Sequence, residues 1–255
     1  MIDIHTHILP GLDDGSQTLS DSLEMAELAL ESGVDTIIAT PHSNQLGRFE
    51  NFDLVHLKHV FSQLQQALRE EGIPLTLHLG MEIFASEDLC EKIQAGALLS
   101  LNRSRYYLVE FAFDEAPEFI GDILDGMLSV GAIPVIAHPE RYFCVQDYPS
   151  LIYHWLQLGC FTQLNNGSIF GKFGRHAQIA ADYLLQHRLA TCIASDAHSP
   201  VMRTTHMRDI IEYLLETYGE REMLRLLFEN PDRILYDRDI PHHGSLPERR
   251  LGLFF

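Results

Sequence analysis

The stretch Asp3-Ile4-His5-Thr6-His7 is the part of this chain that decides how the rest is interpreted. Apolar and polar residues alternate along it, which predicts a β-strand with one buried face. Side chains two residues apart on a strand point to the same side, so His5 and His7 project together, as two ligands of one metal must. A lone His-x-His pair is more often two half-exposed histidines at a strand end, so the other motifs decide between these interpretations.

Five further motifs each end an apolar run with a side chain that can bind a metal. They are Thr40-Pro41-His42, Gly80-Met81-Glu82, Val109-Glu110, Ala137-His138-Pro139-Glu140-Arg141 and Ser195-Asp196-Ala197-His198. In parallel α/β folds the carboxyl ends of the strands meet at one rim, where the functional site lies. Imidazole and carboxylate are N and O ligands that Zn, Mn and Fe(II) accept. The motifs therefore predict that separate strands deliver these side chains, together with Asn165, to one metal site.

Length and periodicity predict one α/β domain with a mostly parallel sheet. The chain has 255 residues, of which 46% are apolar, enough to bury a large core. Seven strand-like segments, nearly all followed by a helical one, are expected at residues 2–7, 34–40, 75–81, 106–111, 133–137, 161–164 and 190–194. The last helices are expected near residues 201–218 and 220–229. We assign residues 1–236 to the domain and residues 237–255 to a tail that is either docked or disordered.

The formal charge of −18 disfavours nonspecific binding of nucleic acid, which requires positive charge to neutralise phosphates. An anionic substrate would need a local concentration of positive charge from metals and arginines. No apolar run approaches the ~20 residues that span a bilayer. No signal peptide is visible, so we expect a cytoplasmic protein that does not insert into membranes.

The cysteines do not form the nucleophilic loop of the cysteine-dependent phosphatases. None of the four is in C-x-x-C spacing, and none has an arginine six residues further on, so a Cys-x5-Arg loop is absent from the sequence. We expect buried, inert thiols at Cys90, Cys144, Cys160 and Cys192.

With these motifs placed, the chain resembles the polymerase-and-histidinol-phosphatase (PHP) superfamily. Within it, the chain is most similar to the protein-tyrosine phosphatases of bacterial capsule and exopolysaccharide operons. The matching stretches are MIDIHTHILPGLDDG at 1–15, TPH at 40–42, GMEIF at 80–84, VEF at 109–111, AHPERY at 137–142, NNGS at 165–168 and SDAH at 195–198. The resemblance extends to about residue 235 and implies a distorted (β/α)7 TIM-like barrel that hydrolyses phosphotyrosine in proteins with the help of metals.

The resemblance also implies three divalent metal ions, with Mn favoured and Fe or Zn as alternatives. The implied ligands are His5, His7, Glu82 and Asp196 for the first ion, Glu82, Glu110 and His138 for the second, and Asp14, His42 and His198 for the third. Glu82 would bridge the first two ions. Asp13 is an alternative to Asp14. Many PHP phosphatases of small molecules have a histidine where Glu110 stands, so the carboxylate favours the tyrosine-phosphatase branch.

Besides Glu82, the resemblance implies two catalytic arginines, Arg141 and Arg203, because a guanidinium matches phosphate oxygens bidentately. The alternative for Arg203, which is expected to open a helix, is a surface ion pair, and Arg208 is its nearest rival. Four aromatic residues could flank a substrate phenyl ring, but ordinary packing is the better interpretation for each of Phe49, Phe111, Phe113 and Tyr142.

The implied partner is a phosphotyrosine-containing protein, namely the tyrosine-rich tail of a bacterial tyrosine autokinase that regulates capsule or exopolysaccharide synthesis. One alternative is a PHP hydrolase of a small phosphate monoester such as histidinol phosphate. A second is a regulatory module that binds the phosphorylated kinase tail with little turnover, although a binding module does not need a full set of metal ligands. A PHP exonuclease domain is disfavoured by the acidic charge.

Overall fold

The computed structural model describes residues 1–241, and its strands form two parallel sheets. The first sheet has the order β1-β2-β4, with β1 at Ile2–Thr6, β2 at Thr36–Ala39 and β4 at Thr76–Leu79. The second has the order β3-β5-β6-β7-β8-β9. Its strands are His42–Ser43, Glu82–Phe84, Tyr106–Glu110, Ile133–Ala137, Phe161–Asn165 and Cys192–Ala194.

Two of the seven predicted strands, at residues 34–40 and 75–81, are each continued after an interruption by a short strand that was not predicted, which explains why residues 1–241 contain nine strands. β3 follows β2 after Thr40-Pro41, and β5 follows β4 after Gly80-Met81. Pro41 has no N–H to donate to a neighbouring strand, so the ladder is interrupted there. Each broken pair counts as one strand, and the seven strands then follow one another around the fold in chain order.

The last strand returns to the first. The Asp196 N–H donates to the His5 carbonyl at 2.9 Å, and the His7 N–H donates to the Ala197 carbonyl at the same distance. These bonds connect the end of β9 to the end of β1. The predicted distorted (β/α)7 barrel is therefore confirmed.

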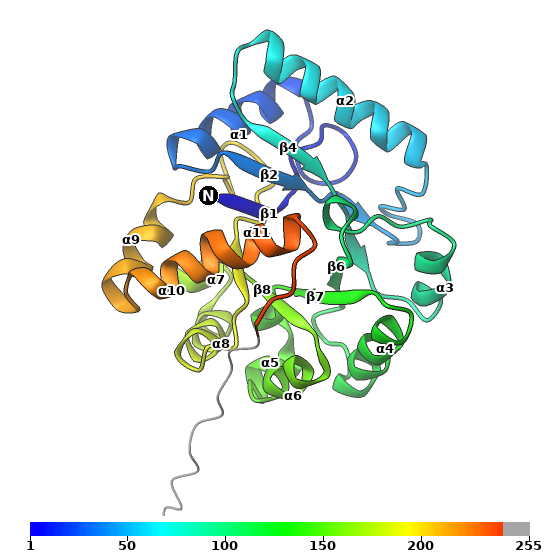
Figure 1. The fold of residues 1–255 in the computed structure, drawn as a ribbon, viewed down its shortest axis with the longest axis vertical. Coiled ribbons are helices and arrows are strands. Elements are labelled where there is room, and N and C mark those ends of the chain that lie inside the picture. The colour runs from blue at the N-terminus through cyan, green and yellow to red at the C-terminus, as the bar shows by residue number, and fades with distance from the viewer. Residues whose placement is uncertain (242–255) are drawn as a thin grey trace, which may run out of the picture.

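Helices surround the strands, as Figure 1 shows. The longer ones are α1 (Leu19–Glu31), α2 (Leu54–Glu70), α4 (Pro117–Ser129), α6 (Leu151–Leu158), α8 (Arg175–Gln186) and α9 (Arg208–Thr217). The shorter ones are α3 (Leu89–Gln94), α5 (Phe143–Asp147), α7 (Asn166–Ile169), α10 (Glu220–Leu224) and α11 (Asn230–Leu235). Single turns η1 (Leu101–Arg103) and η2 (Pro139–Arg141) and the π-helical η3 (Arg225–Glu229) complete the set. Within residues 1–241, no helix is both long enough and apolar enough to cross a bilayer.

The interior of the barrel is apolar at its amino end and polar at its carboxyl end. Ile4, Ile38 and Leu108 point inward from their strands and are fully buried. Ile234 and Leu235 of α11 belong to this cluster and close the amino end of the barrel, and Figure 1 shows α11 lying across that end. Burial of this apolar surface stabilises the barrel and leaves its opposite end free for polar side chains.

The described part of the predicted tail is docked. Arg105 contacts the carboxylates of Asp237 and Asp239 at 3.0 Å, and Ile240 is buried in the apolar cluster at the amino end of the barrel. The remaining tail residues, 242–255, lie outside the described residues.

Candidate metal centre

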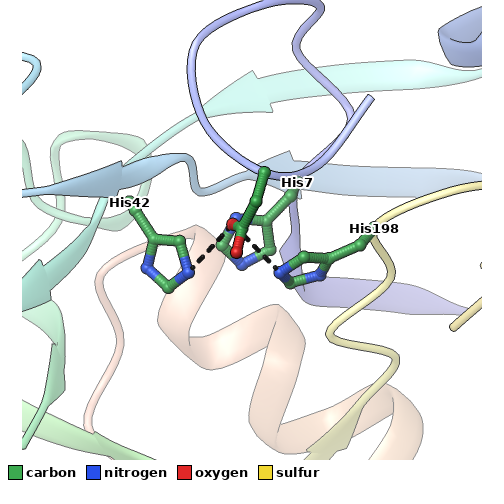
Figure 2. Close-up of side chains that lie close together, drawn as sticks. His7, His42 and His198 are labelled. Carbon is green, nitrogen blue, oxygen red and sulfur yellow. Dashed lines mark ion pairs between the residues drawn. The ribbon is translucent and has the colours of Figure 1, made fainter. Parts of the chain in front are cut away.

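All nine predicted ligands lie together at the carboxyl ends of the strands. Their ligand atoms form four overlapping groups, and within each group the atoms lie within 4.8 Å of one another. The groups are His7, Asp14, His42 and His198; His5, His7 and Asp196; His5, Glu82 and His138; and His42, Glu82 and Glu110. Figure 2 shows the imidazole rings of His7, His42 and His198 turned toward one another, although they come from three separate segments.

Glu82 is the carboxylate that two of these groups share, and four imidazoles surround it. Its Oε2 lies 3.2 Å from Nε2 of both His5 and His7 and 2.9 Å from Nδ1 of His42. Its Oε1 lies 2.9 Å from Nε2 of His138. Burial opposes ionisation of Glu82, but the histidine charges outweigh burial and hold the pKa of its carboxyl well below the usual range.

Glu110 and His138 show why this site fits divalent cations. Burial, followed by the nearby charge of Glu82, raises the pKa of Glu110 to about 8, since two buried carboxylates repel each other. Burial lowers the pKa of His138 to about 4, which leaves its imidazole in the neutral form that metals bind. The buried Oε2 of Glu82 accepts no hydrogen bond. A cation would satisfy that oxygen and relieve the repulsion.

The structure gives different positions to Asp13 and Asp14. The buried Oδ2 of Asp13 accepts from Nδ1 of His7 at 2.7 Å and from the His42 N–H at 2.8 Å. Asp14 is more exposed, with 42% of its side-chain surface accessible, and its Oδ1 faces Nε2 of His42 at 3.5 Å and Nε2 of His198 at 3.6 Å. The geometry therefore favours Asp14 as the ligand, whereas Asp13 fixes the ring of His7 so that its Nε2 faces the cluster.

Gly15 permits this arrangement of the two aspartates. A Cβ atom at this position would lie 2.3 Å from the His7 carbonyl and 2.9 Å from Oδ1 of Asp13. No side chain fits there, so the loop can fold back onto the end of β1.

A chain of hydrogen bonds that the sequence did not reveal fixes His5. The carboxylate of Asp196 can only accept, so Nδ2 of Asn165 donates to it at 2.6 Å. Oδ1 of Asn165 then accepts from Nε2 of Gln163 at 2.9 Å, and Oε1 of Gln163 accepts from Nδ1 of His5 at 2.8 Å. His5 thus carries its proton on Nδ1 and turns Nε2 toward the cluster. The signal for Gln163 was its spacing of two residues from Asn165 on β8.

A cavity of about 330 Å³ opens beside the cluster, and three arginines line it: Arg48, Arg141 and Arg203. Sequence reasoning did not select Arg48, which lies 3.3 Å from Oδ2 of Asp14. Arg208, the rival of Arg203, instead donates to the Glu31 carbonyl at 2.5 Å. The geometry therefore favours Arg203 over Arg208 as a residue of this site.

The prediction that Arg203 opens a helix is wrong. Residues 201–207 form a loop, and α9 begins at Arg208. Arg203 has a φ of 53°, and His138 and Asp196 also lie in the left-handed region, with φ of 31° and 50°. Such backbone costs about 1–3 kcal/mol per residue and is characteristic of functional sites. Local sequence does not encode this left-handed conformation, because contacts with distant segments impose it.

The aromatic residues divide into two kinds. Phe111 and Tyr142 are buried, as expected of packing residues, although Phe111 also borders the cavity, and the hydroxyl of Tyr142 donates to the Ala137 carbonyl. Phe113 lines the cavity, and the ring of Phe49 stacks on His42 with centroids 5.7 Å apart.

The cysteines lie outside the cavity lining among the described residues. Cys160 and Cys192 are buried as predicted, whereas the prediction of burial is wrong for Cys90 and Cys144, which are half-buried. Burial raises the thiol pKa of all four, so none is activated as a nucleophile.

Fold and site together define the class: an α/β barrel with a cluster of histidines and carboxylates able to bind several metal ions at the carboxyl ends of its strands. More narrowly, the chain belongs to the CpsB/CapC family of capsular polysaccharide synthesis, whose model matches residues 1–236.

Two relatives and one solved structure are similar to this chain over nearly its whole length. The tyrosine-protein phosphatase YwqE of Bacillus subtilis is 37% identical over 254 residues, which cover 100% of this chain and 99% of YwqE. The tyrosine-protein phosphatase CpsB of Streptococcus pneumoniae is 30% identical over 243 residues, which cover 93% of this chain and 99% of CpsB. A chain from the crystal structures of YwqE and CpsB, described as unique metal-dependent tyrosine phosphatases, matches with a TM-score of 0.90 at 36% identity, covering 98% and 100%.

Proposed function

We propose that this protein is a metal-dependent protein-tyrosine phosphatase that acts in capsular polysaccharide synthesis. The observation that carries the proposal is a buried cluster of histidines and carboxylates beside a cavity lined by arginines. Similarity to tyrosine phosphatases over the full barrel supports it. The proposed substrate is phosphotyrosine in a protein, specifically the tyrosine-rich tail of a bacterial tyrosine kinase. We assign the activity to residues 1–236.

We further propose that the nine ligands hold three divalent ions, with Mn favoured and Fe or Zn as alternatives. The proposed sets are His5, His7, Glu82 and Asp196 for the first ion, Glu82, Glu110 and His138 for the second, and Asp14, His42 and His198 for the third. Bound divalent ions would lower the pKa of water and neutralise charge on a phosphate group.

In this proposal, arginine side chains bind the phosphate group of the substrate. Arg141 and Arg203 would each direct N–H groups at phosphate oxygens, since phosphoryl transfer depends mainly on positioning and charge stabilisation. Together with the metal ions they would make the site locally positive within a chain of formal charge −18. The phenolate leaving group, with a parent pKa of ~10, needs less protonation than an alkoxide. Phe113 offers an aromatic wall to the cavity.

The proposal is tested by comparing turnover of a phosphotyrosine peptide with turnover of histidinol phosphate, on samples whose metal content is measured by elemental analysis. A much higher kcat/KM for the peptide is expected. Faster hydrolysis of histidinol phosphate would point to a small-molecule phosphatase. Tight peptide binding without turnover in saturating Mn would point instead to a regulatory binding module.

Arg141→Ala and Arg203→Ala are each expected to lower kcat/KM on the peptide while retaining the metals. Neither residue is a proposed ligand, and loss of a hydrogen bond to a charged phosphate costs about 1.5–3 kcal/mol, roughly ten- to over a hundredfold in catalytic efficiency. Lysine should rescue only partly, because it lacks the planar fork. Steady-state kinetics and metal content are measured on the same samples.

Arg208→Ala is the matched control, because Arg208 binds a backbone carbonyl away from the cavity. Normal kinetics for Arg203→Ala together with a large defect for Arg208→Ala would transfer the role to Arg208. Normal kinetics for Arg141→Ala would refute its assignment.

A further inference from the structure

One aromatic ring outside the cavity lining contacts both proposed phosphate-binding arginines. Phe173 lies in the turn between α7 and α8 and is half-buried. Cζ of Arg141 lies 4.5 Å from the centroid of this ring, and Cζ of Arg203 lies 5.4 Å from the same centroid. Arg141 also lies 4.3 Å from the ring centroid of Phe113. Segments that are distant in sequence thus bring two guanidinium groups to one ring.

We infer that Phe173 is a positioning residue that holds Arg141 and Arg203 ready for phosphate, an inference that rests on the proposed function. An aromatic face attracts a guanidinium through the ring quadrupole. This attraction uses the π face and leaves the N–H groups of the arginine free to bind an anion. Phe173 is absent from the residues that line the cavity in the described chain, and its contacts with two arginines that do line it assign it a role through them.

The competing partner for both arginines is the carboxylate of Asp196. Its Oδ2 lies 2.5 Å from a terminal nitrogen of Arg203 and 3.8 Å from a terminal nitrogen of Arg141. A carboxylate, unlike a ring, occupies N–H donors and neutralises the charge that a phosphate needs. The ring therefore holds the guanidinium groups in place and leaves their N–H groups free to donate to a phosphate.

The local backbone is shaped to admit this ring. A Cβ at Gly167 would lie 2.8 Å from Cε2 of Phe173, so a larger residue there would displace the ring. Gly174, directly after Phe173, has a φ of 95° and lets the chain turn into α8. Gly167 belongs to α7, which begins directly after Asn165, the residue that donates to Asp196. The ring and the metal-site carboxylate are thus positioned from one short segment.

The first test compares Phe173→Leu with Phe173→Trp and with the control Phe170→Leu. Phe170 stands in the same connection and is 40% exposed, and its ring contacts Tyr213 at a centroid distance of 5.9 Å. Phe173→Leu is expected to lower kcat/KM on a phosphotyrosine peptide roughly three- to thirtyfold and to weaken competitive inhibition by inorganic phosphate by a similar factor. Phe173→Trp should retain most activity, and Phe170→Leu should match the wild type. Metal content should be unchanged in all three.

The second test replaces Phe173 by ring-fluorinated phenylalanines, which keep a similar ring shape but weaken the negative face. Under our inference, log kcat/KM and the affinity for inorganic phosphate fall stepwise with fluorination, which a purely space-filling role would not produce. Equal kinetics across this series, or a Phe173→Leu enzyme indistinguishable from Phe170→Leu, would overturn the inference. Failure of the wild-type protein to hydrolyse the peptide would instead refute the proposed function on which the inference rests.

Discussion

Glu82→Ala is expected to abolish phosphotyrosine hydrolysis and to remove bound metal at the same time. Glu82 is the carboxylate that two of the metal-binding groups share, and its two oxygens lie within 3.2 Å of four imidazoles. Loss of Glu82 would remove from the cluster the negative charge that offsets the bound cations. Mutation of a residue that only hydrogen-bonds to a metal ligand typically lowers metal affinity or activity by about 10–100-fold. Loss of a ligand shared by two ions should therefore lower kcat/KM by more than about a hundredfold. Kinetics and elemental analysis of one preparation provide the measurement.

A buried carboxylate elsewhere supplies the matched control for this variant. Glu222 is 4% exposed and pairs with the guanidinium of Arg225 far along the chain from the cluster. Glu222→Ala should destabilise the fold by about 3 kcal/mol, because it leaves a buried charge unpaired, yet it should keep its metal. A Glu82→Ala enzyme with normal activity and an unchanged metal count would show that Glu82 is not a ligand.

Removal of metal by a chelator is the second change for which we expect near-complete loss of activity. The arginines can hold a phosphate, but the acidified water and much of the positive charge would be gone. Addition of Mn should restore activity, because the apolar cluster at the opposite end of the barrel keeps the fold assembled. Hydrolysis is measured before chelation, after it and after metal addition, with circular dichroism as the check on folding.

Thiol modification is the control for the chelation experiment. Burial raises the pKa of the Cys160 thiol to about 12, and none of the four cysteines lines the cavity in the described chain. A cysteine-blocking reagent should therefore leave activity largely intact. Full activity in excess chelator, on protein shown to contain no metal, would be incompatible with the proposed mechanism.

The sequence by itself determined the barrel and the ligand types. The alternation along Asp3-Ile4-His5-Thr6-His7 and the apolar runs before His42 and Glu82 are local signals, because the period of a strand fixes which side chains share a face. Parallel strands end at the same rim, so residues that follow strands converge without further information. Sequence patterns missed the short strands β3 and β5 that follow Thr40-Pro41 and Gly80-Met81, because their pairing depends on neighbouring strands in the folded barrel.

Only the tertiary structure decided between adjacent or equivalent residues. Asp13 and Asp14 are chemically alike, and their roles differ because the fold turns Asp13 under His7 and Asp14 toward the cavity. Gln163 has only its spacing from Asn165 as a local signal, and Phe173 has none, since each acts on a side chain brought close by folding: His5 for the first and two arginines for the second. Loop conformation and side-chain direction depend on contacts between residues distant in sequence, and strand or helix periodicity carries no record of them.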